Sequence, residues 1–107
     1  MTILNTSILT AFGDFAYHPC SLQEAKTLAN SKYETHSLQS AVGHQSTADI
    51  LTALLGVPVP MNRIQYTQSP GEIALVFKLK GRPPEDVILT VEEMEGIGYE
   101  FGLLVMR

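Results

Sequence analysis

Residues 73–80 of this chain read IALVFKLK, and this stretch decides the fold that we expect for it. Successive side chains of a β-strand point to opposite faces, so the odd-numbered residues from Ile73 to Leu79 share one face, and Ala74 and Val76 lie on the other. Both faces are therefore apolar over the middle of the stretch, whereas the lysines at its end favour solvent. A strand of this kind is typical of the inside of a sheet that is covered on both sides.

Further strands are expected on either side of this stretch. The sequence Ser-Pro-Gly at 69–71 is typical of a tight turn, so residues 63–67 are expected to pair with the stretch as a hairpin. The other expected strands lie at residues 3–9, 33–37 and 99–106. The first of them is expected to run into a polar loop that turns at Gly13 and Asp14.

Three helices are predicted from capping signals that precede apolar faces. Ser21 and Glu24 have the spacing of a capping box at the start of the first helix. Ser46 is the expected N-cap of the second helix, and Gly56 stands where a left-handed C-terminal residue belongs. A further capping box at 90–93 predicts a short acidic third helix. The order β-α-β-α-β-β-α-β then predicts an α+β (α/β-like) fold, with one mixed sheet of about five strands and three helices packed on it.

Length and composition restrict the class of protein. A chain of 107 residues with 45% hydrophobic residues suffices for one domain, here 1–107, with a single core. Its net charge of -4 argues against binding to duplex DNA, which normally requires a basic face. No apolar run approaches the roughly 18 residues of a membrane span, and no secretory signal is evident. A single cysteine, Cys20, fits a reducing compartment, so we expect a cytoplasmic protein without a membrane partner.

The usual cofactor and metal motifs are absent from the sequence. No Walker sequence is present, and the glycines of residues 96–98 precede the final strand and lack a third glycine. The three histidines, His18, His36 and His44, do not have the spacing of metal ligands. Cys20 has no evident base beside it, which argues against a catalytic thiol. We therefore expect neither a metal ion nor a cofactor.

The segment AVGHQST at 41–47 is the first candidate for chemistry. It places His44 beside the start of the second helix, where free N–H groups and the helix dipole attract phosphate oxygens. Gly43 would let the backbone turn sharply or approach a ligand closely. The same residues have a plainer interpretation, in which Gly43 is a turn residue and His44 is a surface side chain that helps to cap the helix.

The segment RPPE at 82–85 is the second candidate. Arg82 can bind phosphate oxygens through its forked guanidinium, and two prolines stiffen its loop. Glu85 could orient a nearby histidine or exchange a proton with it. The alternative is a solvated turn with an incidental ion pair. Arg63 is open to a similar alternative, as part of the polar start of a strand.

These motifs together resemble those of a known family. The segments are AVGHQST at 41–47, LLG at 54–56, NR at 62–63, GEIAL at 71–75 and RPPE at 82–85. In this order and at these spacings they are similar to the viral ring nucleases, the type III anti-CRISPR proteins of archaeal viruses and their bacterial, phage and mobile-element relatives. The resemblance extends from about residue 41 to residue 105.

The resemblance implies a homodimer that binds cyclic tetra-adenylate between its subunits and cleaves it without a metal ion. A ribose 2′-hydroxyl would attack the adjacent phosphorus and leave linear products with 2′,3′-cyclic phosphate ends. By this resemblance His44 is the general acid, Arg82 stabilises charge on the phosphate, and Glu85 completes the catalytic set. The expected substrate contacts are Asn5, Ser7, Gly43, Gln45, Ser46, Thr47 and Arg63.

Two other functions are compatible with the same residues. A non-catalytic protein could sequester or sense a cyclic nucleotide through the same dimer pocket. A structural or regulatory interaction protein could use the same scaffold with His44 only capping a helix. Cleavage of a CRISPR second messenger would also serve a virus, a mobile element or a host cell equally well.

Overall fold

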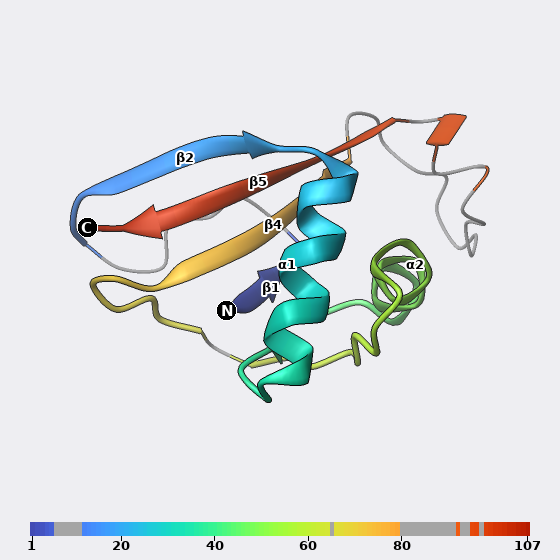
Figure 1. The fold of residues 1–107 in the computed structure, drawn as a ribbon, viewed down its shortest axis with the longest axis horizontal. Helices are drawn as coiled ribbons and strands as arrows, with labels where there is room; N and C mark the ends of the chain where they lie inside the picture. Colours follow the sequence, from blue (N-terminus) through green and yellow to red (C-terminus); the bar gives the residue numbers. More distant parts are fainter. Residues whose placement is uncertain (6–11, 65, 80–91, 93–94, 97) are drawn as a thin grey trace.

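Figure 1 shows a twisted β-sheet with one helix lying across it and a second helix at one end. This computed structural model describes residues 1–5, 12–64, 66–79, 92, 95, 96 and 98–107. The elements are β1 (Thr2–Leu4), β2 (Phe15–Cys20), α1 (Leu22–Glu34), β3 (Gln39–Ser40), α2 (Gln45–Leu55), β4 (Ile73–Leu79) and β5 (Tyr99–Met106). Neither of these helices is long and apolar enough to cross a membrane.

The five strands form one mixed sheet in the order β2-β5-β4-β1-β3. Strand β1 runs parallel to both β3 and β4, while β5 runs antiparallel to both β2 and β4. The predicted α+β class, with a single mixed sheet of five strands, is confirmed. The central position of β4 is also as predicted, because Ala74, Leu75 and Val76 are fully buried and Phe77 is 1% exposed.

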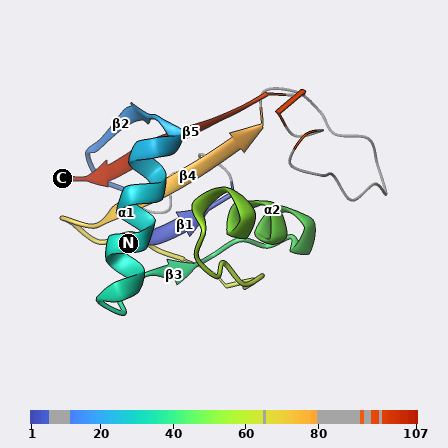
Figure 2. The ribbon, with the colours of Figure 1, turned by 45° about the vertical axis from the view of Figure 1, so that its right-hand side comes forward.

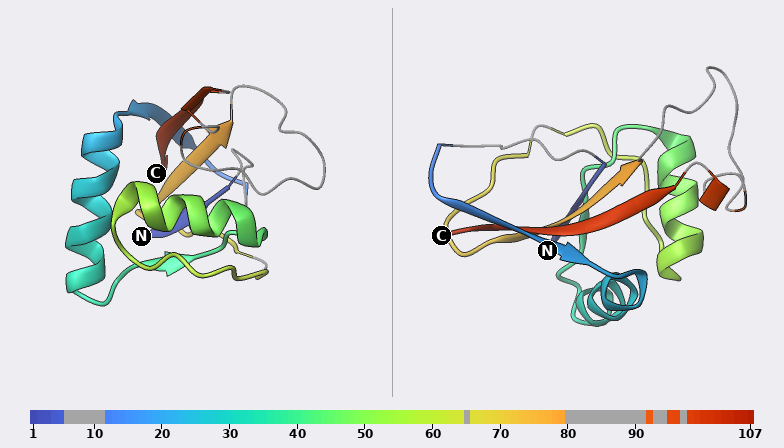
Figure 3. Two further views of the ribbon diagram at one scale, coloured as in Figure 1. Left: turned by 90° about the vertical axis from the view of Figure 1, so that its right-hand side faces the viewer. Right: turned by 90° about the horizontal axis from the view of Figure 1, so that it is seen from above.

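Side chains pack against both faces of the sheet. On one face, buried residues of both helices form a core with Ile3, Leu75 and Phe77 of the strands. On the other face, a smaller cluster around Val76 includes the partly buried Tyr66. The view from above in Figure 3 shows α1 on one side of the sheet and the segment that precedes β4 on the other. This two-sided cover explains why β4 is apolar on both faces.

The predicted hairpin is wrong. Residues 63, 64, 66 and 67 form no strand, and residue 65 lies outside the described residues. The reason is that β1 and β5 pair with the two edges of β4, which leaves no edge for a third strand. Gln68 instead turns its side chain into the fold, where Nε2 donates to the backbone carbonyls of Glu72 and Leu104 at 2.8 Å each.

Two other strand predictions need correction. Strand β2 lies where a polar loop was expected. Among the described strands it pairs with β5 alone, and an edge strand tolerates Pro19 and exposed polar side chains. The strand expected at 33–37 is wrong, since α1 continues to Glu34 and Thr35 caps it. The short strand of this region is β3, which pairs with β1. Of the first expected strand, β1 covers residues 2–4, and residues 6–11 lie outside the described residues.

The helix predictions are confirmed in part. The capping box of α1 is present, with the Glu24 amide donating to Ser21 Oγ at 3.1 Å and the Ser21 amide donating to Glu24 Oε1 at 3.2 Å. Helix α2 begins earlier than predicted, with His44 and not Ser46 at the N-cap, and it ends at the left-handed Gly56 as predicted. The part of the chain that the structure describes holds two helices instead of three, and most of the expected third one, near 90–96, lies outside it.

Replacing His36 with glycine is expected to stabilise the fold. His36 follows the cap of α1 with a φ of 56°, a left-handed conformation that costs a residue with a Cβ about 1–2 kcal/mol. Glycine avoids this cost but loses about 0.5–1 kcal/mol in chain entropy, so the expected gain is about 0.5–1 kcal/mol in urea unfolding. Ser31→Gly, inside the same helix, should instead destabilise by up to about 1 kcal/mol.

Replacing Gly102 with alanine is expected to cost about 1 kcal/mol, the low end of the overpacking range. A Cβ at Gly102 would overlap the ring of Tyr17, which lies over it from the neighbouring strand. Tyr17 is 46% exposed, so we expect its ring to swing outward, which limits the loss. In a Tyr17→Ala background the same change should become neutral or stabilising, because alanine suits a strand better than glycine. An equal cost in both backgrounds, measured by urea unfolding, would contradict the overlap.

Candidate functional site

The candidate site lies at one edge of the sheet. Strands β1, β3 and β4 are parallel, so their carboxyl ends meet at the same edge, as the arrows in Figure 2 show. Asn5 follows β1 at this edge, residues 41–44 lead from β3 into α2, and β4 ends at Leu79. The edge where parallel strands end and helices begin is the usual position of a ligand site in folds with parallel strands.

The N-terminus of α2 is left without a side-chain cap. The His44 carbonyl accepts the first helical bond from the Ala48 amide at 3.0 Å, but no side chain caps the helix and no acidic residue lies in its first turn. The amides of Gln45, Ser46 and Thr47 have no acceptor among the described residues. Helix α1, by contrast, carries a complete capping box. The first turn of α2 therefore offers unpaired N–H groups and a positive dipole end, which suit an anion.

Arg63 adds a fixed positive charge to this helix end. Its Nε donates to the Gly43 carbonyl at 2.8 Å, which holds the exposed guanidinium beside the residue that precedes His44. Its remaining nitrogens have no acceptor in the described part of the chain. Arg63 is thus not the start of a strand, and its contact with Gly43 places it beside the candidate site. A guanidinium held by one bond retains other donors that match phosphate oxygens.

The structure bears on one of the two roles predicted for Gly43, the sharp turn, while the close approach to a ligand stays a prediction. Its φ is outside the left-handed region, and a Cβ built on it would meet Arg63 Cγ at an ordinary 3.6 Å. Neither a sharp turn nor protein packing therefore requires glycine here. The contribution visible in the structure is its carbonyl, which accepts the bond from Arg63.

The predicted site residues differ in how far the structure describes them. His44 and Gln45 are exposed, and Gly43, Ser46 and Thr47 are half-buried around the start of α2. The Gln45 side chain lies along the helix, where Nε2 donates to Asp49 Oδ1 at 2.8 Å. Asn5 is half-buried at the end of β1, and no described contact joins it to His44. Ser7, Arg82 and Glu85 lie outside the described residues.

Two residues with a direct bearing on the site were not predicted as site residues: Ser40, and Asn62, which the sequence showed only as part of the NR motif at 62–63. The Ser40 hydroxyl donates to the Pro60 carbonyl at 2.7 Å and accepts from the Val42 amide at 3.3 Å. The Asn62 side chain donates to the Ser40 carbonyl, and its amide donates to the Val42 carbonyl, both at 2.8 Å. A serine at a strand end carries no sequence signal for such a role, since only the fold brings residues 40 and 60 together.

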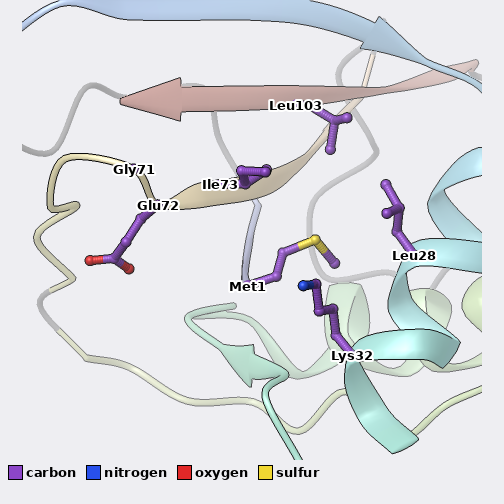
Figure 4. Close-up of a pocket in the computed structure, with 7 residues that line it drawn as sticks. All are labelled: Met1, Leu28, Lys32, Gly71, Glu72, Ile73 and Leu103. Atoms are coloured by element: carbon purple, nitrogen blue, oxygen red, sulfur yellow. The ribbon is translucent and has the colours of Figure 1, made fainter. Parts of the chain in front are cut away.

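A pocket of about 310 Å³ lies elsewhere, at the amino ends of β1 and β4. Figure 4 shows its lining, with Lys32 directed toward Met1 and the Glu72 carboxylate turned away. That carboxylate accepts bonds from Tyr66 Oη and the Ser69 amide, both at 2.9 Å, and these bonds lower the pKa of Glu72. Because its carboxylate is already engaged, this pocket is a weaker candidate than the edge at α2.

Few other side chains among the described residues are candidates for catalysis or metal binding. Burial raises the pKa of the Cys20 thiol, and Glu24 adds to this effect, so the thiolate is disfavoured. Within the same residues, no three His, Cys, Asp or Glu side chains are grouped as metal ligands. The first turn of α2 with Arg63 is therefore the strongest candidate that the structure describes.

The fold and this helix end define an α+β protein with a candidate anion site where its parallel strands end. A sequence model of the family described as STIV B116-like matches residues 1–101, and the chain belongs to this family. B116 of Sulfolobus turreted icosahedral virus shares the fold, with a TM-score of 0.81 over 97% of both chains at 20% identity.

Both viral and bacterial proteins are similar to the chain. Protein 26 of Sulfolobus islandicus filamentous virus is 45% identical over 84 residues, which cover 78% of this chain and 68% of the viral protein. YddF of Bacillus subtilis is 33% identical over 97% of this chain and 94% of its own length. ORF117 of Acidianus two-tailed virus is 36% identical over 92% of this chain and 86% of its own length. These relatives establish that the family spans archaeal viruses and a bacterium.

Proposed function

We propose that this protein is a metal-independent ring nuclease that binds cyclic tetra-adenylate and cleaves it to linear products with 2′,3′-cyclic phosphate ends. The observation that carries the proposal is the uncapped start of α2, where His44, the free amides of its first turn and the Arg63 guanidinium lie together. A phosphodiester bound at this place would meet both hydrogen-bond donors that suit an anion and an exposed imidazole. Membership of a family with viral and bacterial members agrees with the motifs that resemble ring nucleases.

The proposed reaction is an internal transesterification. The ribose 2′-hydroxyl attacks the adjacent phosphorus and loses its proton to water, the bond from phosphorus to the 5′-oxygen breaks, and the 5′-oxygen takes up a proton. His44 supplies that proton, while Arg63 and the α2 amides hold the phosphate. Arg82 stabilises the charge that develops on phosphorus, and Glu85 exchanges a proton with the imidazole. A positioned internal nucleophile with one general acid can account for a large acceleration.

A homodimer suits this substrate. A ring of four phosphates has approximate symmetry, so a twofold axis would present the same helix start to opposite sides of the ring. Each subunit then needs only a few directed donors, and the net charge of -4 does not prevent binding. In this arrangement the protein removes a second messenger of type III CRISPR defence, which would help a virus or mobile element and would also let a host end its own response.

The direct test is mass spectrometry of products after the protein is incubated in EDTA with cyclic tri-, tetra- and hexa-adenylate. We expect linear fragments with 2′,3′-cyclic phosphate ends from the tetra-adenylate ring. Binding without any product would contradict the nuclease and support a sensor that uses the same helix end. Absence of both binding and product would support an interaction protein in which His44 only begins a helix.

A further inference from the structure

We infer that Ser40 and Asn62 are positioning residues, which hold Arg63 and His44 in a fixed relation at the edge of the sheet. The inference rests on the proposed function for its kinetic part only. Ser40 is 7% exposed, and the Asn62 side-chain amide is engaged with a backbone carbonyl. The side-chain bonds of both residues go to backbone groups of the protein, so we expect their effect on the site to act through Arg63 and His44.

The two residues join two segments that are distant in the sequence. The first segment leads from β3 to His44, and the second leads from Pro60 to Arg63. Ser40 Oγ bonds to the Pro60 carbonyl, and both donors of Asn62 return to the first segment, at the carbonyls of Ser40 and Val42. Together with the bond from Arg63 Nε to the Gly43 carbonyl, four hydrogen bonds of 2.7 to 2.8 Å cross between the segments.

The segment that these four hydrogen bonds join to residues 60–63 is itself paired with the sheet. Ser40 pairs with Ile3 in the register of β3 and β1, and the Ala41 amide donates to the Ile3 carbonyl at 2.9 Å. Asn62 directly precedes Arg63, so loss of its bonds is expected to loosen the segment that carries the guanidinium and to weaken the bond of Arg63 to the Gly43 carbonyl. Catalysis by positioned groups is sensitive to displacements of about 1 Å, which can cost about a hundredfold in rate.

The test compares Asn62→Asp and Ser40→Ala with a matched control in the full-length chain. Asn62→Asp keeps the shape but removes the donor that faces the Ser40 carbonyl. Ser40→Ala removes the hydroxyl and is a second route to the same loss. Asn30→Asp is the control, because Asn30 Nδ2 also bonds to a backbone carbonyl, that of Leu55 at 3.0 Å, at the far end of α2.

Two measurements separate positioning from stability. Hydrogen exchange of the Arg63 Nε–H and the Val42 amide, followed by NMR, should accelerate at least about tenfold in both variants and stay unchanged in the control. In the same variants kcat should fall about 10–100-fold, while the control keeps the parent value. Unchanged exchange, or faster exchange with unchanged kcat, would overturn the inference.

The positioning role of Ser40 and Asn62 can still be tested if the unmodified protein does not cleave the ring. That result would end the proposed function, but inorganic phosphate can replace the ring as a probe of the same helix start. Chemical shifts of the amides at 45–47 would then report phosphate binding. Weaker binding in Asn62→Asp than in Asn30→Asp would support positioning, and equal binding would overturn it.

Discussion

Replacing His44 with alanine is expected to lower the rate of cyclic tetra-adenylate cleavage about 10²–10⁴-fold, the usual contribution of a general acid. The affinity for the ring should be largely retained, because the amides of α2 and the Arg63 guanidinium remain in place. An interaction that matters only in the transition state lowers kcat without weakening substrate binding. Single-turnover kinetics, together with titration calorimetry of the bound ring, would measure the two quantities separately.

His18→Ala is the matched control for this prediction. His18 is also an exposed histidine, but it lies on the edge strand β2 and not at the start of α2. Its replacement should leave both rate and affinity unchanged. A His44→Ala protein that cleaves the ring at the parent rate would remove the imidazole from the proposed mechanism, even if the ring still binds.

Replacing Phe77 with alanine is expected to lower the free energy of unfolding by about 3–5 kcal/mol. Phe77 is 1% exposed in the middle of β4, and its ring lies 5.7 Å from that of Tyr99 and 5.4 Å from that of Phe101. The change removes both ring contacts and leaves a cavity between the sheet and the helices. Since small domains are stable by about 5–15 kcal/mol, the loss would be a large part of the total. Urea unfolding followed by circular dichroism would measure it.

Phe12→Ala is the control with the same chemical change. Phe12 is fully exposed, so its replacement should alter the free energy of unfolding by less than about 0.5 kcal/mol. Phe77→Leu, which keeps most of the buried volume, should cost about 1 kcal/mol. If Phe77→Ala and Phe12→Ala had similar effects, the central place of β4 in the core would be wrong.

Local signals in the sequence were sufficient to predict the elements that have a cap or a characteristic apolar pattern of their own. The capping box at Ser21 and Glu24 and the left-handed Gly56 follow from short-range rules, because the groups that satisfy them lie within a few residues. The final strand from Tyr99 to Met106 was predicted from its run of apolar residues, although its pairing partners are distant in the sequence. The two apolar faces of β4 likewise predicted its central position. The motif containing His44 was recognised from its residues, and the structure adds that its helix end has no side-chain cap.

Only the tertiary structure decided which segments pair and which residues meet at the edge of the sheet. The hairpin prediction was wrong because β1 and β5 occupy both edges of β4, and edge availability is a property of the whole sheet. Strand β2 was missed because its partner, β5, lies more than 80 residues further along the chain. The roles of Ser40 and Asn62 could not be predicted for the same reason, since hydrogen bonds between distant segments leave no periodic pattern in the sequence.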